Sequence, residues 1–201
     1  LEYPNYATSY ALIALTRSGK PEDSLLVQKM QRYLGSQQWA PGRGIEQSHV
    51  AVGGWGFGET RFAPGSVGHV DLSHTRRALE ALRPASDSDM SRSAQRFLAL
   101  AQKLPTDRRP VIDGPQPDGA FDGGFYASPV VFGTNKAGVD QTEGGARYFR
   151  SYATATCDGI LALLAAGVAS DDPRIAAALT WLEQHPAIDR VPGIPETERG
   201  Q

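Results

Sequence analysis

Four polar residues that could transfer protons or bind a metal lie near the expected starts of helices in this chain. Asp71, His74 and Asp158 carry carboxylate and imidazole groups, and Cys157 adds a thiol directly before Asp158. Imidazole, carboxylate and thiolate groups serve in acid–base catalysis and in zinc binding. We therefore take Asp71, His74 and Asp158 as candidate catalytic residues, and Cys157, Asp158 and His74 as candidate metal ligands.

A simpler interpretation of these residues is structural, and the sequence favours it. A free cysteine behaves mostly as a small hydrophobic residue, so Cys157 is expected to be buried. His74 is expected to be a helix-start residue whose polar groups are satisfied by the backbone. The other three histidines are expected to face solvent or to cap helices: His49, His69 and His185. No cofactor and no bound metal are therefore predicted.

Two glycine-rich stretches with embedded aromatic rings, residues 53–59 and 116–125, supply candidate binding residues. Glycine permits tight turns there while the rings pack on helix ends, so both stretches are expected to clamp helical hairpins together. The candidate binding residues are Trp55, Phe57, Asp118, Phe121, Asp122, Phe125 and Tyr152. Three acids in this region, Asp113, Asp118 and Asp122, lack the spacing of an EF-hand calcium loop.

The elements that must position these residues follow from a three-fold internal repeat. An apolar block that ends in leucine is followed, always at the same distance, by an aromatic residue and a second leucine. The three pairs are Leu15 with Tyr33, Leu79 with Phe97, and Leu163 with Trp181. Such self-similarity is typical of repeat architectures, in which each unit buries its apolar face only against its neighbours.

Each repeat predicts a hairpin of two helices, over residues of about 6–38, 71–104 and 152–185. The first helix is apolar nearly all round and is expected inside, whereas the second is amphipathic and is expected outside. Arg76 and Arg77 interrupt one inner helix, so they need either partners or a path to solvent. The sequence therefore predicts an all-α fold: one partial α/α-toroid domain over residues 1–201, with about three hairpins and long glycine-rich loops.

Composition excludes several classes of function. Lys+Arg 20 against Asp+Glu 22 leave a net charge of -2, which gives no electrostatic footprint for nucleic acid. No run of about 18 apolar residues occurs, so no transmembrane segment is predicted. The single cysteine excludes an internal disulfide. We expect a soluble protein, either cytoplasmic or exported after removal of an N-terminal segment.

The motifs resemble the Gln/Trp-type repeats of squalene-hopene cyclases and the related Gly-Gly-Phe repeats of protein prenyltransferase β subunits. The resemblance rests on residues 53–57 and 116–125, and on residues 71–75 and 151–154 ahead of apolar helices, and it covers nearly the whole chain. It implies a toroid of about six hairpins around an apolar cavity. This chain would then be a fragment of a longer protein, or half of a ring that another chain or a second copy completes.

The catalytic groups of that superfamily are not matched. Class II cyclases donate a proton from the middle aspartate of an Asp-x-Asp-Asp-Thr motif, whereas residues 71–75 place Ser73 at that position. The prenyltransferases bind zinc through Asp, Cys and His. Their Asp-x-Cys pair is absent here, and Tyr152 stands near the place of their histidine.

Two functions follow from the sequence. The first is a toroid-repeat module without the superfamily's catalytic residues, which acts in binding or as a subunit of a larger assembly. Its partners would be another protein chain or a second copy, together with an isoprenoid or other apolar ligand. The second is an isoprenoid-processing enzyme, a cyclase or prenyltransferase variant, with Trp55, Phe121 and Phe125 as π surfaces for cationic intermediates.

Overall fold

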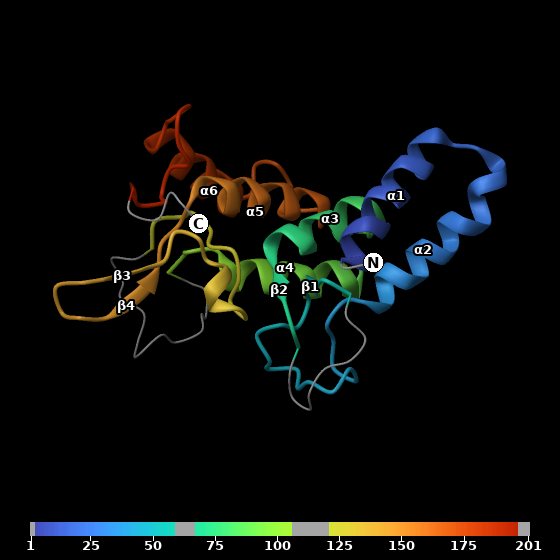
Figure 1. Ribbon diagram of the computed structural model, residues 1–201, viewed down its shortest axis with the longest axis horizontal. Coiled ribbons are helices and arrows are strands. Elements are labelled where there is room, and N and C mark those ends of the chain that lie inside the picture. The colour runs from blue at the N-terminus through green and yellow to red at the C-terminus, as the bar shows by residue number, and fades with distance from the viewer. Residues whose placement is uncertain (1–2, 59–66, 106–120, 197–201) are drawn as a thin grey trace.

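The computed structural model of the chain describes residues 3–58, 67–105 and 121–196 (Figure 1). These residues form six α-helices and four short strands. The helices are α1 (Pro4–Ser18), α2 (Ser24–Ser36), α3 (Leu72–Leu82), α4 (Asp89–Ala101), α5 (Ala153–Ala165) and α6 (Pro173–Gln184). The strands are β1 (Trp55–Gly56), β2 (Val70–Asp71), β3 (Val139–Gln141) and β4 (Arg147–Phe149).

The all-α prediction is wrong, because the two long loops contain two small antiparallel sheets. β1 pairs with β2 and places Trp55 opposite Asp71, and β3 pairs with β4 and places Val139 opposite Phe149. A loop that lies against the protein must pair its backbone N–H and C=O groups, and these short strands do so. Strands of two or three residues leave no alternating pattern in the sequence, which is why the pattern did not predict them.

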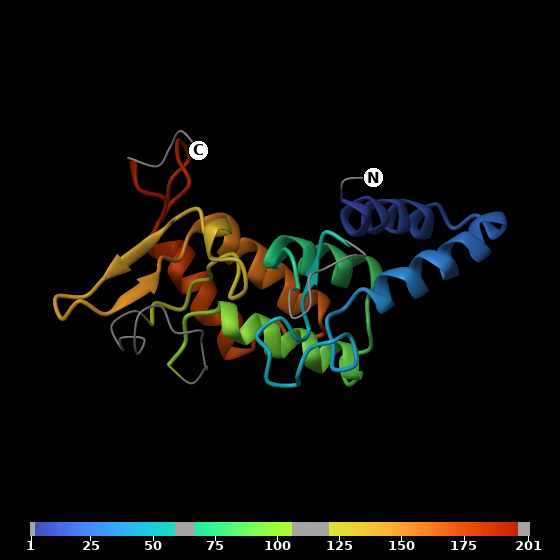
Figure 2. The same ribbon diagram turned by 60° about the horizontal axis from the view of Figure 1, so that its bottom comes forward.

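The hairpins form an inner and an outer layer of helices. α1, α3 and α5 are the inner helices, and α3 contacts both of the others (Figure 1 and Figure 2). Each outer helix packs on its own inner helix, and α2 and α4 also pack on the next one: α2 contacts α3, and α4 contacts α5. α6 packs on α5, and no further inner helix follows it in the described residues. None of the described helices is long and apolar enough to cross a membrane.

The inner helices are less buried than their apolar sequences suggest. Leu12 of α1 and Leu163 of α5 are fully buried, but Tyr10, Leu161 and Leu164 are 42%, 38% and 41% exposed. The exposed side chains lie on the same side of the layer, where they line one groove. The described part of the chain therefore leaves an open, partly apolar inner face.

A glutamine that follows an outer helix joins the first hairpin to the second. The Gln38 side-chain amide donates hydrogen bonds of 3.1 Å to the Gly53 carbonyl and 2.9 Å to the Met90 carbonyl. Gly53 belongs to the first glycine-rich stretch and Met90 to the first turn of α4, so one side chain ties the loop to the next outer helix. Gln38 is buried, and its amide would be costly to bury without these partners.

The second glycine-rich stretch repeats this contact. The Gln102 amide donates hydrogen bonds of 3.0 Å to the Gly123 carbonyl and 2.7 Å to the Arg174 carbonyl in the first turn of α6. Gly53 and Gly123 also have positive φ angles, which glycine adopts without a steric cost. These contacts agree with the expectation that the glycine-rich stretches clamp the hairpins together.

A threonine near the start of an inner helix fixes the aromatic residue of each stretch. The Trp55 N–H donates to Thr75 Oγ1 at 3.0 Å, and the Phe125 N–H donates to Thr156 Oγ1 at 3.1 Å. Both rings are fully buried, and Trp55 Nε1 also donates to the Leu34 carbonyl at 2.8 Å. Trp55 and Phe125 are therefore core residues rather than the open π surfaces expected from the sequence.

Gly53→Ala is expected to lower the free energy of unfolding much more than Gly42→Ala. The φ angles of the two glycines are 98° and 95°, so alanine is strained at either position, by about 1–2 kcal/mol. At Gly53 the added Cβ would also lie 1.8 Å from the Ser93 carbonyl oxygen, whereas nothing lies within 4 Å at Gly42. We expect a loss of about 3–5 kcal/mol at Gly53 by urea denaturation. Equal losses of unfolding free energy in the two variants would show that the loop at Gly53 is not closely packed on α4.

Candidate functional site

Two cavities lie along α3, and they collect most of the polar residues singled out in the sequence. The first, which we call the end pocket, has a volume of about 430 Å³ and lies at the N-terminal ends of α3 and α5. Its lining includes His69, Asp71, Ser73, Lys136, Tyr152 and Asp158. The second, which we call the inner groove, has a volume of about 750 Å³ and lies on the open face of the inner helices. Its lining includes Tyr10, Ile13, Arg17, Arg76, Arg77, Glu80, Arg83, Leu161 and Leu164.

Asp71 is the centre of a His–Asp–His cluster beside the end pocket. It ends β2 and caps α3, because its Oδ1 accepts a 2.9 Å hydrogen bond from the His74 N–H. The same oxygen lies 2.9 Å from His74 Nδ1, and Asp71 Oδ2 forms a hydrogen bond with His69 Nε2. One histidine precedes the strand and the other lies in the first turn of the helix, so both rings reach the same carboxylate.

Aromatic rings hold both imidazoles in place. Phe57 stacks on His69 with ring centroids 4.0 Å apart, and it meets His74 edge-on at 4.8 Å. Tyr6 of α1 also contacts the His74 ring, at 5.5 Å. The Phe57 carbonyl accepts a 3.1 Å hydrogen bond from the Asn5 N–H, which fixes the loop on α1. Phe57, a predicted binding residue, thus acts by orienting the two histidines.

Asp71 is held in its ionised form. Burial opposes its charge, but hydrogen bonds from the His69 and His74 rings and from the His74 backbone N–H outweigh burial and bring its pKa well below the usual range. A carboxylic acid that protonates an alkene must instead carry its proton before the reaction. Asp71 is therefore unsuited to the role of a cyclase acid.

Asp158, the other candidate acid, is engaged in an ion pair. Its Oδ1 accepts a 2.6 Å hydrogen bond from Arg76, whose Nε also donates to Glu80 at 2.7 Å. Asp158 lines the end pocket and Arg76 lines the inner groove, so this pair stands between the two cavities. Tyr152 in the end pocket stays neutral, because burial and the charges of Asp71 and Asp158 raise its pKa.

The inner groove is rich in arginine. Four arginines line it, and Glu80 is the one acid among its lining residues. Arg76 and Arg77 both donate to Glu80, and the Arg77 guanidinium lies 5.1 Å from the centre of the Tyr10 ring. The Arg77 Nε is buried and has no acceptor in the described part of the chain. The two arginines that interrupt the apolar helix therefore have partners, and one of them retains an unused donor.

The fold brings together a set of possible metal ligands that differs in part from the set predicted from the sequence. Cys157 is exposed on α5 rather than buried, and partial desolvation together with the charge of Asp158 raises the pKa of its thiol. It is thus not an activated thiolate. Within residues 3–58, 67–105 and 121–196, the side chains whose ligand atoms converge are His69, Asp71 and His74. His74 is common to both sets.

Two predicted residues of the second glycine-rich stretch are not part of either cavity. Asp122 accepts hydrogen bonds of 3.0 Å from Lys103 Nζ, just after α4, and of 2.7 Å from Ser151 Oγ, just before α5. Phe121 is partly buried. Asp118 and Asp113 lie outside the described residues. The calcium site considered for these acids therefore receives no support from Asp122, whose carboxylate is already engaged.

His69 was expected to face solvent or to cap a helix, and this expectation is wrong. Its side chain is 19% exposed and is held between Asp71 and Phe57. The sequence signal that could have identified it is the His-x-Asp-x-x-His spacing at residues 69–74, where a strand passes directly into a helix. Comparisons with protein-family models, with curated proteins and with solved structures found no match to this chain.

Asp71→Asn is expected to lower the free energy of unfolding by about 2 kcal/mol at neutral pH, since it removes the charge that accepts three hydrogen bonds. The depressed pKa of Asp71 means that its contribution is present above the unfolded-state pKa of about 3.9 and is lost as the pH falls below it. The difference in stability between wild type and variant, measured by urea denaturation at pH 5 and at pH 2, should thus be fully present at pH 5 and mostly lost at pH 2.

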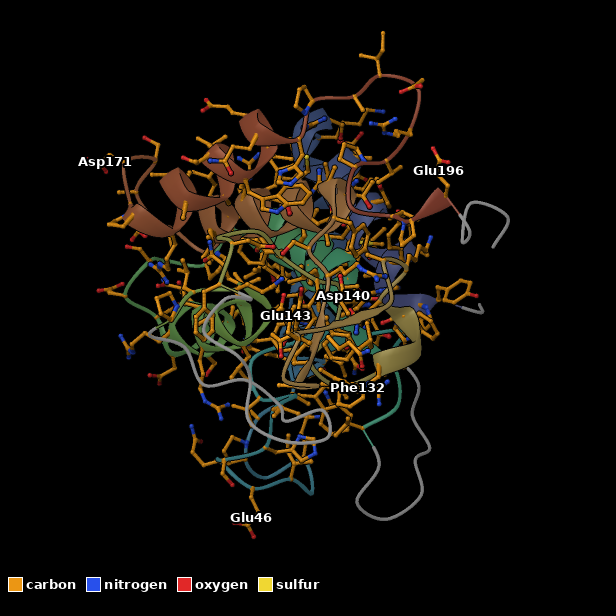
Figure 3. The ribbon with its side chains drawn as sticks, turned by 90° about the vertical axis from the view of Figure 1, so that its left-hand side faces the viewer. Glu46, Phe132, Asp140, Glu143, Asp171 and Glu196 are labelled. Atoms are coloured by element: carbon orange, nitrogen blue, oxygen red, sulfur yellow. The ribbon has the colours of Figure 1, made fainter. Side chains whose placement is uncertain are left out.

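Asp171→Asn is the matched control for this measurement. Asp171 is an exposed carboxylate between α5 and α6 (Figure 3), so its replacement should change stability little at either pH. A constant difference between wild type and Asp71→Asn over that pH range would show that the Asp71 charge contributes no stability.

Proposed function

We propose that this chain is a binding module of helical hairpin repeats, and that its inner groove holds an elongated amphipathic anion. The observation that carries the proposal is the composition of the groove, in which arginines stand beside exposed leucines. A volume of about 750 Å³ is in the range of cavities that bind small molecules. An isoprenoid chain with a phosphate or diphosphate head is the ligand class that suits both parts of the lining.

The arginine side of the groove supports an anionic head group. The Arg77 Nε has no acceptor, and Arg17 forms no ion pair in the described part of the chain. A guanidinium presents a fork of N–H donors that matches phosphate oxygens, and such charge-assisted hydrogen bonds are short and strong. A phosphate beside Arg17 and Arg77 would supply the acceptors that these side chains lack.

The leucine side of the groove supports an apolar tail. Leu161 and Leu164 of α5 are 38% and 41% exposed, and Ile13 of α1 lines the same groove. Burying such apolar area is worth about 25 cal/mol per Å². The sequence resemblance to the cyclase and prenyltransferase superfamily points to the same class of tail.

An isoprenoid-processing enzyme, the other hypothesis, finds less support. Asp71 is ionised and Asp158 is paired with Arg76, so neither residue is prepared to protonate an alkene. A module that keeps the repeats of the superfamily without its acid accounts for both observations. Turnover of a polyprenyl substrate by this chain would favour the enzyme instead.

Farnesyl diphosphate is expected to bind at least about tenfold more tightly than farnesol or inorganic diphosphate, because only the first molecule engages both arginines and leucines. Calorimetric titration measures the three dissociation constants. Arg17→Gln and Leu164→Gln should each weaken farnesyl diphosphate binding by about 5- to 10-fold. Arg32→Gln, on the exposed surface of α2 and outside the groove, is the control and should leave binding unchanged.

Two outcomes of the titration would reject the proposal. If inorganic diphosphate binds as tightly as farnesyl diphosphate, the apolar tail contributes nothing to binding, and the groove is only a basic surface. The absence of binding by all three compounds would remove the groove as a ligand site.

We also propose that a second copy of this chain packs against the free side of α6. Leu34 and Leu98, at equivalent positions of α2 and α4, are fully buried, and Leu34 packs with Ala81 of the next inner helix. The equivalent Leu182 of α6 is only partly buried, and the nearby Leu179 is 45% exposed. Two copies of three hairpins would supply the six hairpins that the superfamily resemblance implies.

Sedimentation equilibrium tests this arrangement. The chain is expected to form a dimer at micromolar concentration, and Leu179→Glu should shift it toward monomer, because a buried carboxylate is costly. Arg92→Glu changes a residue of α4, in the middle hairpin, whose side chain is 61% exposed, and it should leave the dimer intact. A wild-type chain that stays monomeric at every concentration would show that no second copy covers α6.

A further inference from the structure

We propose that His69, Asp71 and His74 form a binding site for a divalent transition metal, and that zinc is the ion that fits best. The three side chains each offer one ligand atom, and these atoms all lie within 4.8 Å of one another. The proposal is independent of the inner groove, which none of the three residues lines.

The geometry requires little movement of the ligands. A tetrahedral zinc ion with Zn–N distances of about 2.0–2.1 Å separates its ligand atoms by roughly 3.3 Å. His74 Nδ1 lies 2.9 Å from the nearer carboxylate oxygen, and the widest spacing in the group is no more than 4.8 Å. Entry of the ion therefore needs shifts of a few tenths of an ångström up to about 1 Å, which side-chain rotations supply.

The ligands are held before any metal arrives. Asp71 Oδ1 accepts the His74 backbone N–H, which anchors the carboxylate to the first turn of α3. Phe57 stacks on the His69 ring and meets the His74 ring edge-on, so neither imidazole is free to turn away. A metal would require lone pairs on His69 Nε2 and His74 Nδ1, with the ring protons on the opposite nitrogens. The present hydrogen bonds to Asp71 thus mark the directions along which a cation would be bound.

Two imidazoles and one carboxylate select the class of ion. Imidazole nitrogen suits zinc and neighbouring transition metals, whereas calcium and magnesium prefer oxygen ligands. Three protein ligands leave a fourth position of the tetrahedron for water or for a ligand oxygen.

The fourth coordination position of such an ion would lie beside a cavity that can hold a ligand. His69 and Asp71 line the end pocket, a cavity of about 430 Å³ that also contains Lys136, Tyr152 and Asp158. A molecule in this pocket can reach the metal while its other polar groups meet the lysine ammonium and the tyrosine hydroxyl. The site thus has the form of an open metal centre rather than a closed structural one.

Calorimetric titration of the metal-free protein with zinc chloride tests the proposal. We expect one equivalent to bind, and Co²⁺ in its place should give the visible absorption of a four-coordinate ion. His69→Ala and His74→Ala should each weaken zinc binding by more than the about 10- to 100-fold that changes outside the ligand shell cost. His69→Gln, which keeps a polar side chain, should also lose binding, and circular dichroism shows whether each variant is folded.

His49→Ala and His185→Ala are the matched controls. His49 accepts a 3.1 Å hydrogen bond from the Ala51 N–H, and His185 stacks on Trp181, so both lie outside the cluster. Both variants should bind zinc like the wild type. A wild-type chain that binds no zinc, or folded His69 and His74 variants that bind it unchanged, would show that the cluster is only a hydrogen-bonded helix cap. Displacement of zinc by equal concentrations of magnesium or calcium would likewise overturn the assignment.

Discussion

Two buried glutamine side chains fix the arrangement on which the rest of this molecule depends. Gln38 and Gln102 each join the carbonyl of a glycine in the loop that follows the glutamine to a carbonyl in the first turn of the next outer helix. A helical repeat is stable only through its contacts with neighbouring repeats, so the spacing and angle of these contacts set the geometry of the array. The loops can come this close because glycine has no side chain, and at Gly53 a Cβ would collide with the α4 backbone.

The His–Asp–His cluster is a consequence of this packing. The clamp brings β1 against β2 in the register that pairs Trp55 with Asp71 and Gly56 with Val70. One step further in the same antiparallel register, Phe57 comes opposite His69, and the two rings stack at 4.0 Å. The same register ends β2 at Asp71, where the carboxylate begins α3 and meets His74. The site is therefore positioned by backbone pairing, and the Phe57 ring holds the imidazoles.

The sequence predicted the parts of the molecule that depend on local periodicity. Repeat spacing predicts the three hairpins, the glycine and aromatic content of the two stretches predicts their clamp role, and a place near a helix start marks Asp71 and His74. The short strands leave no periodic signal, so the all-α prediction was wrong. The contact between His69 and Phe57 could not be predicted from their spacing in the sequence. It depends on the register in which β1 pairs with β2. Trp55 and Phe125 are chemically suited to bind cations, and only their burial shows that they belong to the core.

The charge of the inner groove explains how arginines fit on an otherwise apolar helix. Arg76 and Arg77 face two acids, Glu80 and Asp158, so the charges of these four residues balance. The uncompensated charge in the groove is therefore that of Arg17 and Arg83. Arg83 ends α3 with a φ of 47°, a left-handed conformation that glycine adopts with less strain. A glycine would end the helix at lower cost, so what arginine adds at this position is its side chain, and that side chain lines the groove.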